Sequence, residues 1–130
     1  MKKEFIIFGK PDISQAENMA VNEVLNSKWL STGEVCHKFE KEFQEFIGGC
    51  NAVSVSSCTT GLILSMMALD IGPGDEVILP TLTFCATLNA VLAVGANPVL
   101  VDSDSLGHID PKEVEKAITR NTKAVIPVHY

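Results

Sequence analysis

The sequence has few aromatic residues, few basic residues and no long apolar run. Aromatic side chains make up 6% of its 130 residues, with one tryptophan and one tyrosine. Lys and Arg number 10 against 16 Asp and Glu, so the formal net charge is −6. The largest basic cluster is Lys2-Lys3. The sequence therefore contains no basic patch of the kind that binds nucleic acid, and we expect no nucleic-acid partner.

Membrane insertion and secretion also lack support. No apolar stretch approaches the roughly 20 residues of a membrane span. The apolar run Phe5 to Phe8 stops at Gly9-Lys10-Pro11, whereas a secretory signal needs about 7–15 apolar residues. We therefore expect a soluble, cytoplasmic protein with no membrane partner.

The cysteines are spaced too widely for a zinc site. Cys36, Cys50, Cys58 and Cys85 are 14, 8 and 27 positions apart, and no C-x-x-C pair is present. Zinc ligands come in tighter pairs, and disulfides are rare without secretion. We expect free thiols and no metal. A thiol nucleophile at Cys58 is disfavoured, because no His or Asn partner can be placed beside it.

Three common motifs are missing as well. There is no G-x-G-x-x-G after a strand, no G-x-x-x-x-G-K-[ST] loop and no G-x-S-x-G elbow. A Rossmann-type binding module is therefore disfavoured. An acidic chain can still bind a small anion, because backbone N–H groups at a helix N-terminus bind phosphate without basic side chains.

The pattern of residues changes at about residue 50. Before it, a Ser-x-x-Glu capping box and helical spacing predict a helix over 15–27, and a second helix is predicted over 34–47. The i, i+4 pair Phe39 and Phe43 is expected to pack into a core. Residues 1–50 are thus predicted to form a helical N-terminal arm.

Residues 51–130 alternate between strand and helix patterns. Strands are predicted over 51–56, 76–79, 98–101 and 123–128, and helices over 59–69, 84–94 and 111–120. The helix over 59–69 is apolar nearly all round and is predicted to be buried. This β-α-β-α-β-α-β order predicts the α/β class, with a mostly parallel sheet covered on both faces.

Two segments that follow predicted strands could bind a ligand. Residues 56–61 are small and hydroxylated and begin a helix, so they could cradle a phosphate, or Ser57 or Thr59 could simply cap the helix. The two interpretations carry equal weight on the residues alone. Phe84 follows the next strand and could stack on a flat ring. Core packing is the commoner role for such a Phe.

Other polar segments leave their alternatives open. The loop from Trp29 to Gly33 could line a pocket or anchor the arm. Asp102 and Asp104 follow a strand with His108 nearby and could bind a metal, although two acids in a solvated loop are commoner. His129 follows the last strand and faces either the core or a site. The sequence stops where the next ligand-facing loop would begin, so we expect a piece of a longer protein.

Taken together, the motifs resemble the N-terminal third of the DegT/DnrJ/StrS-type sugar aminotransferases, which depend on pyridoxal 5'-phosphate (PLP). The resemblance covers essentially all 130 residues. Its blocks are Pro11-Asp12-Ile13, Trp29-Leu30-Ser31-Thr32-Gly33, Phe39-Glu40, Val55-Ser56-Ser57-Cys58-Thr59, Gly72-Pro73-Gly74-Asp75-Glu76-Val77-Ile78, Pro80-Thr81-Leu82-Thr83-Phe84, Asn89-Ala90-Val91, Gly95-Ala96-Asn97-Pro98-Val99, Val101-Asp102, Ile109-Asp110-Pro111 and Thr122-Lys123-Ala124-Val125-Ile126-Pro127-Val128-His129-Tyr130.

The resemblance implies a fold-type-I PLP-transferase, with residues 1–50 as the arm and 51–130 as the first, truncated part of the PLP-binding large domain. It implies that backbone N–H groups of the SxT-type loop hold the PLP phosphate and that an aromatic ring stacks on the pyridine. Those roles fall on Thr59 and Thr60, with Cys58 beside them, and on Phe84. Ser31 and Thr32 would lie near the substrate.

The resemblance also implies the activity: transfer of an amino group, from glutamate, through PLP to a nucleotide-linked keto-sugar, by a homodimer. The Schiff-base Lys and the Asp that pairs with the pyridine nitrogen would come beyond residue 130. We therefore assign no catalytic residue within this chain. Two alternatives remain. One is a sugar dehydratase of the same family, with His in place of that Lys. The other is a truncated, non-catalytic chain that binds a phosphate ligand or a partner subunit.

In the family's sheet, the strand over 51–56 would lie at one edge, away from the other three. The strands between them would come from outside this chain. Unpaired buried strands are costly and prone to aggregation. An isolated 130-residue chain is therefore expected to be unstable, rearranged or rescued by association.

Overall fold

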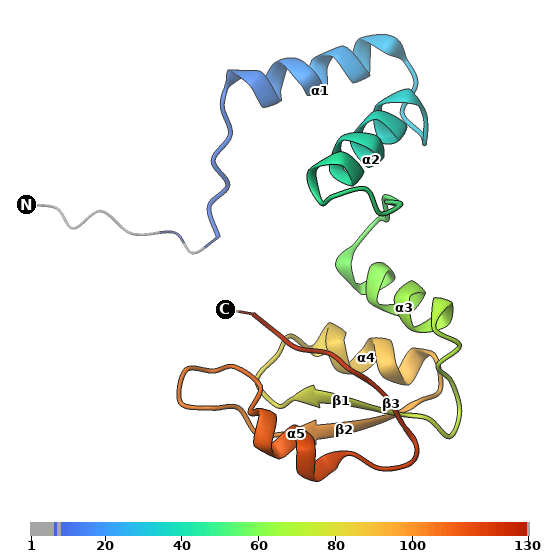
Figure 1. The fold of residues 1–130 in the computed structure, drawn as a ribbon. Coiled ribbons are helices and arrows are strands. Elements are labelled where there is room, and N and C mark those ends of the chain that lie inside the picture. Colours follow the sequence, from blue (N-terminus) through green and yellow to red (C-terminus); the bar gives the residue numbers. More distant parts are fainter. Residues whose placement is uncertain (1–6, 8, 130) are drawn as a thin grey trace, which may run out of the picture. The chain divides into compact units, whose positions relative to one another are not determined.

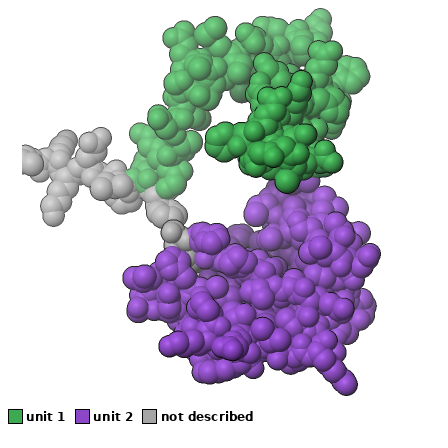
Figure 2. Space-filling model, in the orientation of Figure 1, with its two compact units in different colours: residues 1–54 green, residues 55–130 purple. Residues whose placement is uncertain are grey.

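The computed structural model describes residues 7 and 9–129, which fall into two compact units. The first unit is residues 1–54 and the second is residues 55–130 (Figure 2). The division falls four residues after the boundary expected from the sequence. None of the helices within the described residues is long and apolar enough to cross a membrane.

The first unit contains the two predicted helices, α1 (Gln15–Ser27) and α2 (Glu34–Phe46). The capping box of α1 is confirmed. The Ser14 hydroxyl accepts the N–H of Ala16 at 3.1 Å, and the Glu17 carboxylate accepts the Ser14 N–H at 2.6 Å. Each end of a helix leaves unpaired backbone groups, so this reciprocal pair fixes where α1 begins.

The prediction that Phe39 and Phe43 pack into a core is wrong for the described chain. Their rings contact each other, with centroids 6.0 Å apart, but the two residues remain 57% and 46% exposed. Neither α1 nor α2 buries a residue. The i, i+4 spacing correctly places both rings on one face. Burial of that face requires a second layer, and no described part of this unit supplies one.

The second unit is an α/β layer structure, which confirms the predicted fold class. Its elements are, in chain order, α3 (Cys58–Ala68), β1 (Glu76–Pro80), α4 (Cys85–Ala93), β2 (Asn97–Val101), α5 (Pro111–Ala117) and β3 (Thr122–Val125). The three strands are parallel, in the order β2-β1-β3. The chain moves from β1 to β2 through α4 and then crosses back through α5 to β3. Because such crossovers are right-handed, the two helices cover opposite faces of the sheet, as Figure 1 shows.

Strand β1 lies at the centre of the core. Val77, Ile78 and Leu79 are 0% exposed, as are Ala90 and Val91 of α4. Successive strand side chains point to opposite faces, and Val77 and Leu79 accordingly join Ala90 and Val91 in one apolar cluster. The near-continuous apolar strand EVILP thus follows from burial on both faces.

Two predictions for residues 51–130 are wrong. Residues 51–56 form no strand, because a strand needs a hydrogen-bonding neighbour and the sheet of β2, β1 and β3 does not extend to them. Helix α3 is also less buried than its apolar sequence predicted. Met66 is buried, but Leu64 and Met67 are 45% and 57% exposed. One face of α3 packs against α4 and the apolar cluster that includes Val77 and Leu79, and the face that carries Leu64 and Met67 stays exposed.

The central position of β1 yields a stability prediction. Leu79→Ala removes a fully buried side chain and leaves a cavity, so it should lower the free energy of unfolding by about 2–5 kcal/mol in urea unfolding. The matched control is Leu106→Ala, whose side chain belongs to a residue 74% exposed and should change stability by no more than about 0.5 kcal/mol. Equal effects of the two substitutions would contradict the central placement of β1.

Candidate functional site

The first turn of α3 presents backbone N–H groups that the helix itself does not use. Ser57 caps the helix, since its hydroxyl accepts the Thr60 N–H at 3.1 Å and its carbonyl accepts the Gly61 N–H at 3.1 Å. Ordinary capping by Ser57 is thus confirmed. The N–H groups of Cys58 and Thr59 donate to no acceptor in the described part of the chain. They remain available to an anion at the positive end of the helix.

The side chains around this turn favour an anion further. The Thr60 hydroxyl lies 3.0 Å from the Ser57 hydroxyl and 3.4 Å from that of Ser56. Ser56, Ser57 and Cys58 are exposed, and Thr59 and Thr60 are half-buried. The first turn of α3 contains no acidic residue. A ligand oxygen would therefore meet hydroxyl donors and backbone amides with no carboxylate to repel it.

Phe84 occupies the equivalent place before α4. It is the N-cap residue of that helix, with φ −71° and ψ 142°, and it is 76% exposed. Packing into the core, the commoner role, is therefore wrong for this side chain. Figure 1 shows α3 and α4, which pack against each other, both beginning at the carboxyl end of the strands. Ligands bind beyond that end in α/β sheets.

A hydroxyl pair that the sequence reasoning missed fixes the backbone beside Phe84. The hydroxyls of Thr83 and Thr87 lie 2.8 Å apart, and Thr87 is 7% exposed. The Thr87 N–H donates to the Phe84 carbonyl at 3.0 Å. The i, i+4 spacing of the two threonines across a helix start is a signal that could have indicated this contact. The first turn of α4 therefore holds Phe84 at a defined place.

The acidic loop after β2 is a folded turn. One carboxylate oxygen of Asp104 accepts the N–H groups of Leu106 and His108 at 2.8 and 2.9 Å, and the other lies 3.7 Å from the His108 Nδ1. No cluster of three metal-ligating side chains occurs within residues 9–129. Burial raises the pKa of Asp104. The pKa is lowered further by hydrogen bonds from the amides of His108 and Leu106 and by the charge of the His108 ring. Together these effects exceed that of burial, so the pKa lies below 3.8.

The loop from Trp29 to Gly33 belongs to the first unit. The Trp29 Nε1 donates to the Thr32 carbonyl at 3.0 Å, and its ring lies so close to Gly33 that a Cβ there would come within 2.5 Å of Nε1. Ser31 and Thr32 are exposed, at an open pocket of about 760 Å³. Cys58, Thr59, Thr60 and Phe84 belong to the second unit. His129 is exposed in that unit too.

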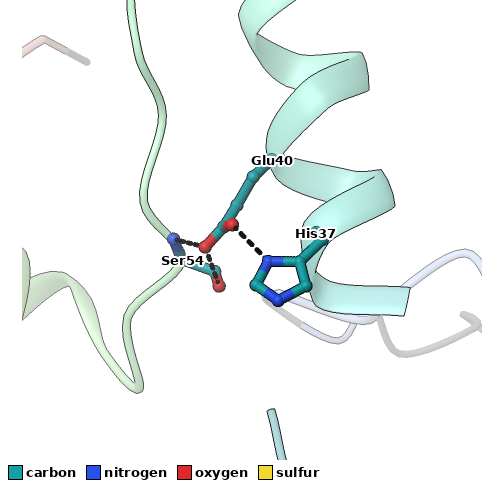
Figure 3. A network of polar contacts seen from close by, with 3 residues as sticks. All are labelled: His37, Glu40 and Ser54. Atoms are coloured by element: carbon teal, nitrogen blue, oxygen red, sulfur yellow. Dashed lines mark hydrogen bonds and ion pairs between the residues drawn. The ribbon is translucent and has the colours of Figure 1, made fainter. Parts of the chain in front are cut away.

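Figure 3 shows a polar network in the first unit that the sequence reasoning also missed. Glu40 of α2 accepts both the N–H and the hydroxyl hydrogen of Ser54 at 2.8 Å on Oε1, and its Oε2 lies 3.3 Å from the His37 Nδ1. The pKa of Glu40 is lowered most by the hydrogen bond from the Ser54 amide, then by that from the Ser54 hydroxyl and then by the His37 ring. Burial raises the pKa, but by less. Glu40 lies three residues before Phe43, and a carboxylate on an apolar helix face is the signal that could have indicated this role.

The Asp104 turn yields a pH prediction. The pKa is lower in the folded chain than its ordinary 3.8, so the turn's stabilisation is present above pH 3.8 and is lost as the pH falls through the lower folded value. The amide protons of Leu106 and His108 should then exchange faster, as NMR measures. Asp104→Asn keeps an acceptor oxygen but does not titrate, so its exchange profile should lack this step. A step that persists in the variant would assign the titration to another group.

Comparison with known proteins identifies the family. The sequence model of the DegT/DnrJ/EryC1/StrS aminotransferase family matches residues 11–130. The spore coat polysaccharide biosynthesis protein SpsC of Bacillus subtilis (strain 168) is 46% identical over 130 residues, which are 99% of this chain and 33% of SpsC.

Solved structures agree with the sequence match. Spr1654 from Streptococcus pneumoniae in its PLP form, named as a sugar aminotransferase, superimposes with a TM-score of 0.86 at 36% identity, over 92% of this chain and 31% of its own. DesV of S. venezuelae gives 0.82 at 43% identity, over 88% and 32%. The chain spans about one third of the length of these relatives. It belongs to the DegT/DnrJ/EryC1/StrS aminotransferase family.

Proposed function

We propose that this chain supplies the cofactor-binding front part of a PLP-dependent sugar aminotransferase, with PLP bound between the start of α3 and Phe84. The observation that carries the proposal is the exposed Phe84 ring, which α4 presents at the same end of the sheet as the uncommitted amides of α3. Family membership and the PLP form of a relative support it.

The start of α3 fits the phosphate of PLP. The N–H groups of Cys58 and Thr59 are free to donate to phosphate oxygens, and the hydroxyls of Thr59 and Thr60 can add further hydrogen bonds. The Thr60 N–H already donates to Ser57, so Thr60 would act through its hydroxyl. The helix end adds roughly half a positive charge, which compensates for the absence of a basic side chain.

Phe84 would orient the cofactor ring. An aromatic face on a flat heterocycle gains dispersion and offset-stacking energy and removes water from one side of the ring. The partly buried Thr83–Thr87 pair fixes the backbone beside Phe84, so little backbone entropy would be lost on binding. PLP, when bound, supplies an electron sink for amino-group transfer. The residues of this chain bind and orient it, and we place no proton-transfer group among them.

The substrates and assembly are part of the same proposal. The amino group would come from glutamate and the acceptor would be a nucleotide-linked keto-sugar, whose hydroxyls Ser31 and Thr32 are suited to contact. A homodimer would cover apolar surface such as Phe46, which is 85% exposed, and the neighbouring Phe39 and Phe43. The complete enzyme would act in the cytoplasm.

Phe84 provides the test of this function. In the complete gene product, Phe84→Ala should weaken PLP binding by roughly 1–3 kcal/mol, about 5-fold to 150-fold in Kd, measured by absorbance titration. The unfolding free energy should change little, because the side chain is already exposed. Phe84→Tyr keeps the ring and should bind PLP nearly as the parent does. Equal PLP affinity in Phe84→Ala and the parent protein would remove Phe84 from the site.

A further inference from the structure

We infer that Trp29 is a positioning residue that holds Ser31 and Thr32 in place for the sugar substrate. The Trp29 Nε1 donates to the Thr32 carbonyl at 3.0 Å, across the loop that contains both hydroxyl residues. The inference rests on the proposed function, because that function assigns Ser31 and Thr32 to the substrate hydroxyls. Trp29 itself would act through the backbone of the loop and not on the substrate.

The loop that carries Ser31 and Thr32 is tied to a helix at each end. Ser27 is the last residue of α1, and its hydroxyl accepts the Trp29 N–H at 3.2 Å. At the other end of the loop, Gly33 is the N-cap residue of α2. Between these two ends, the indole of Trp29 bonds to the backbone of Thr32. The backbone on both sides of the two hydroxyl residues is therefore held, and Trp29 takes part on each side.

The indole ring occupies the space beside Gly33. A Cβ at residue 33 would lie 2.5 Å from the Trp29 Nε1 and 2.6 Å from its Cδ1, so any larger residue would displace the ring. Gly33 has φ −169°, an extended conformation that any residue can adopt, so its backbone does not require glycine. The ring is what requires glycine here. One side chain therefore bonds to Thr32 and packs against the residue that follows it.

A fixed loop matters because Ser31 and Thr32 are exposed. Both lie at the open pocket of about 760 Å³, and Trp29 forms part of the same wall. A loop that is free to change conformation presents its hydroxyls correctly only part of the time, and its ligand then binds more weakly in proportion. The bond to the Thr32 carbonyl restricts the loop before the substrate arrives, so less backbone entropy is lost on binding.

This role predicts an effect on one substrate only. In a ping-pong transfer, the kcat/KM of each substrate reports on the half-reaction of that substrate. Ser31 and Thr32 are assigned to the sugar, so loss of their position should lower kcat/KM for the keto-sugar and leave kcat/KM for glutamate unchanged. A loss of folding would lower both values alike, because it reduces the fraction of active enzyme. The ratio of the two values separates positioning of the loop from support of the fold.

The experiment measures this ratio in the complete gene product, with glutamate as donor and a panel of keto-hexoses linked to UDP, dTDP or GDP as acceptors. Trp29→Ala removes the hydrogen bond and the ring and should lower the keto-sugar to glutamate ratio about tenfold. Trp29→Phe keeps a ring but lacks the Nε1 donor and should lower it about threefold. The matched control is Val21→Ala on α1, since Val21 is 59% exposed and Trp29 is 63% exposed. It should match the parent.

Gly33→Ala is an independent test that leaves Trp29 in the sequence. The new Cβ should displace the indole ring and lower the ratio about tenfold. In Trp29→Ala no ring remains to be displaced, so adding Gly33→Ala should change the ratio by no more than about twofold. Any cost of alanine at the N-cap position is the same with and without Trp29, so it cancels from this comparison.

Each outcome decides the question. A selective loss in Trp29→Ala and in Gly33→Ala, with no further loss in the double variant, supports the inference. An unchanged ratio in Trp29→Ala, a loss of the same size in Val21→Ala, or additive losses in the double variant overturns it and leaves the proposed function intact. If Trp29→Ala fails to fold, a lowered ratio in Gly33→Ala supports the inference and an unchanged one overturns it. A parent protein that is inactive with every keto-hexose of the panel overturns the inference together with the proposed substrate.

Discussion

Strand β1 is buried on both faces and runs parallel to a neighbour on each side, and the rest of the second unit is arranged around it. Parallel neighbours need crossover helices, and the order β2-β1-β3 requires one helix on each face. The same constraint makes every strand end at one edge of the sheet. The loop that presents Phe84 emerges there because β1 ends there, so the packing of Val77, Ile78 and Leu79 also positions the candidate site.

The candidate phosphate site depends on backbone more than on side chains. The chain is acidic overall, with a net charge of −6, and its first turn of α3 has no basic residue. The attraction for an anion comes instead from N–H groups that the helix geometry leaves unpaired. Such a site depends on where the chain enters the helix, which the Ser57 cap fixes.

Local features could be predicted from the sequence, and long-range ones could not. The capping box at Ser14, the cap at Ser57 and the alternation of strands and helices after residue 75 are set by neighbours within a few residues, and the structure confirms them. The strand over 51–56 was wrong because pairing needs a partner that periodicity cannot show. The burial of Phe39 was wrong because a stripe indicates a face but not what covers it. The contact between Glu40 and Ser54 spans 14 residues, and its only signal in the sequence is a carboxylate on an apolar helix face.

The exposure of Phe84 reversed the commoner expectation for a helix-start Phe. The family resemblance named that residue, and its exposure supports the proposed role without testing it.

The central claim is that this chain holds the cofactor of an aminotransferase and leaves the covalent attachment to a lysine elsewhere in the protein. The most direct measurement is to load the complete gene product with PLP, reduce it with borohydride and map the pyridoxyl group by mass spectrometry. The account predicts a pyridoxyl group on a lysine outside these 130 residues. A pyridoxyl group on a lysine of this chain, PLP bound but unattached to any lysine, or no bound PLP at all would contradict it.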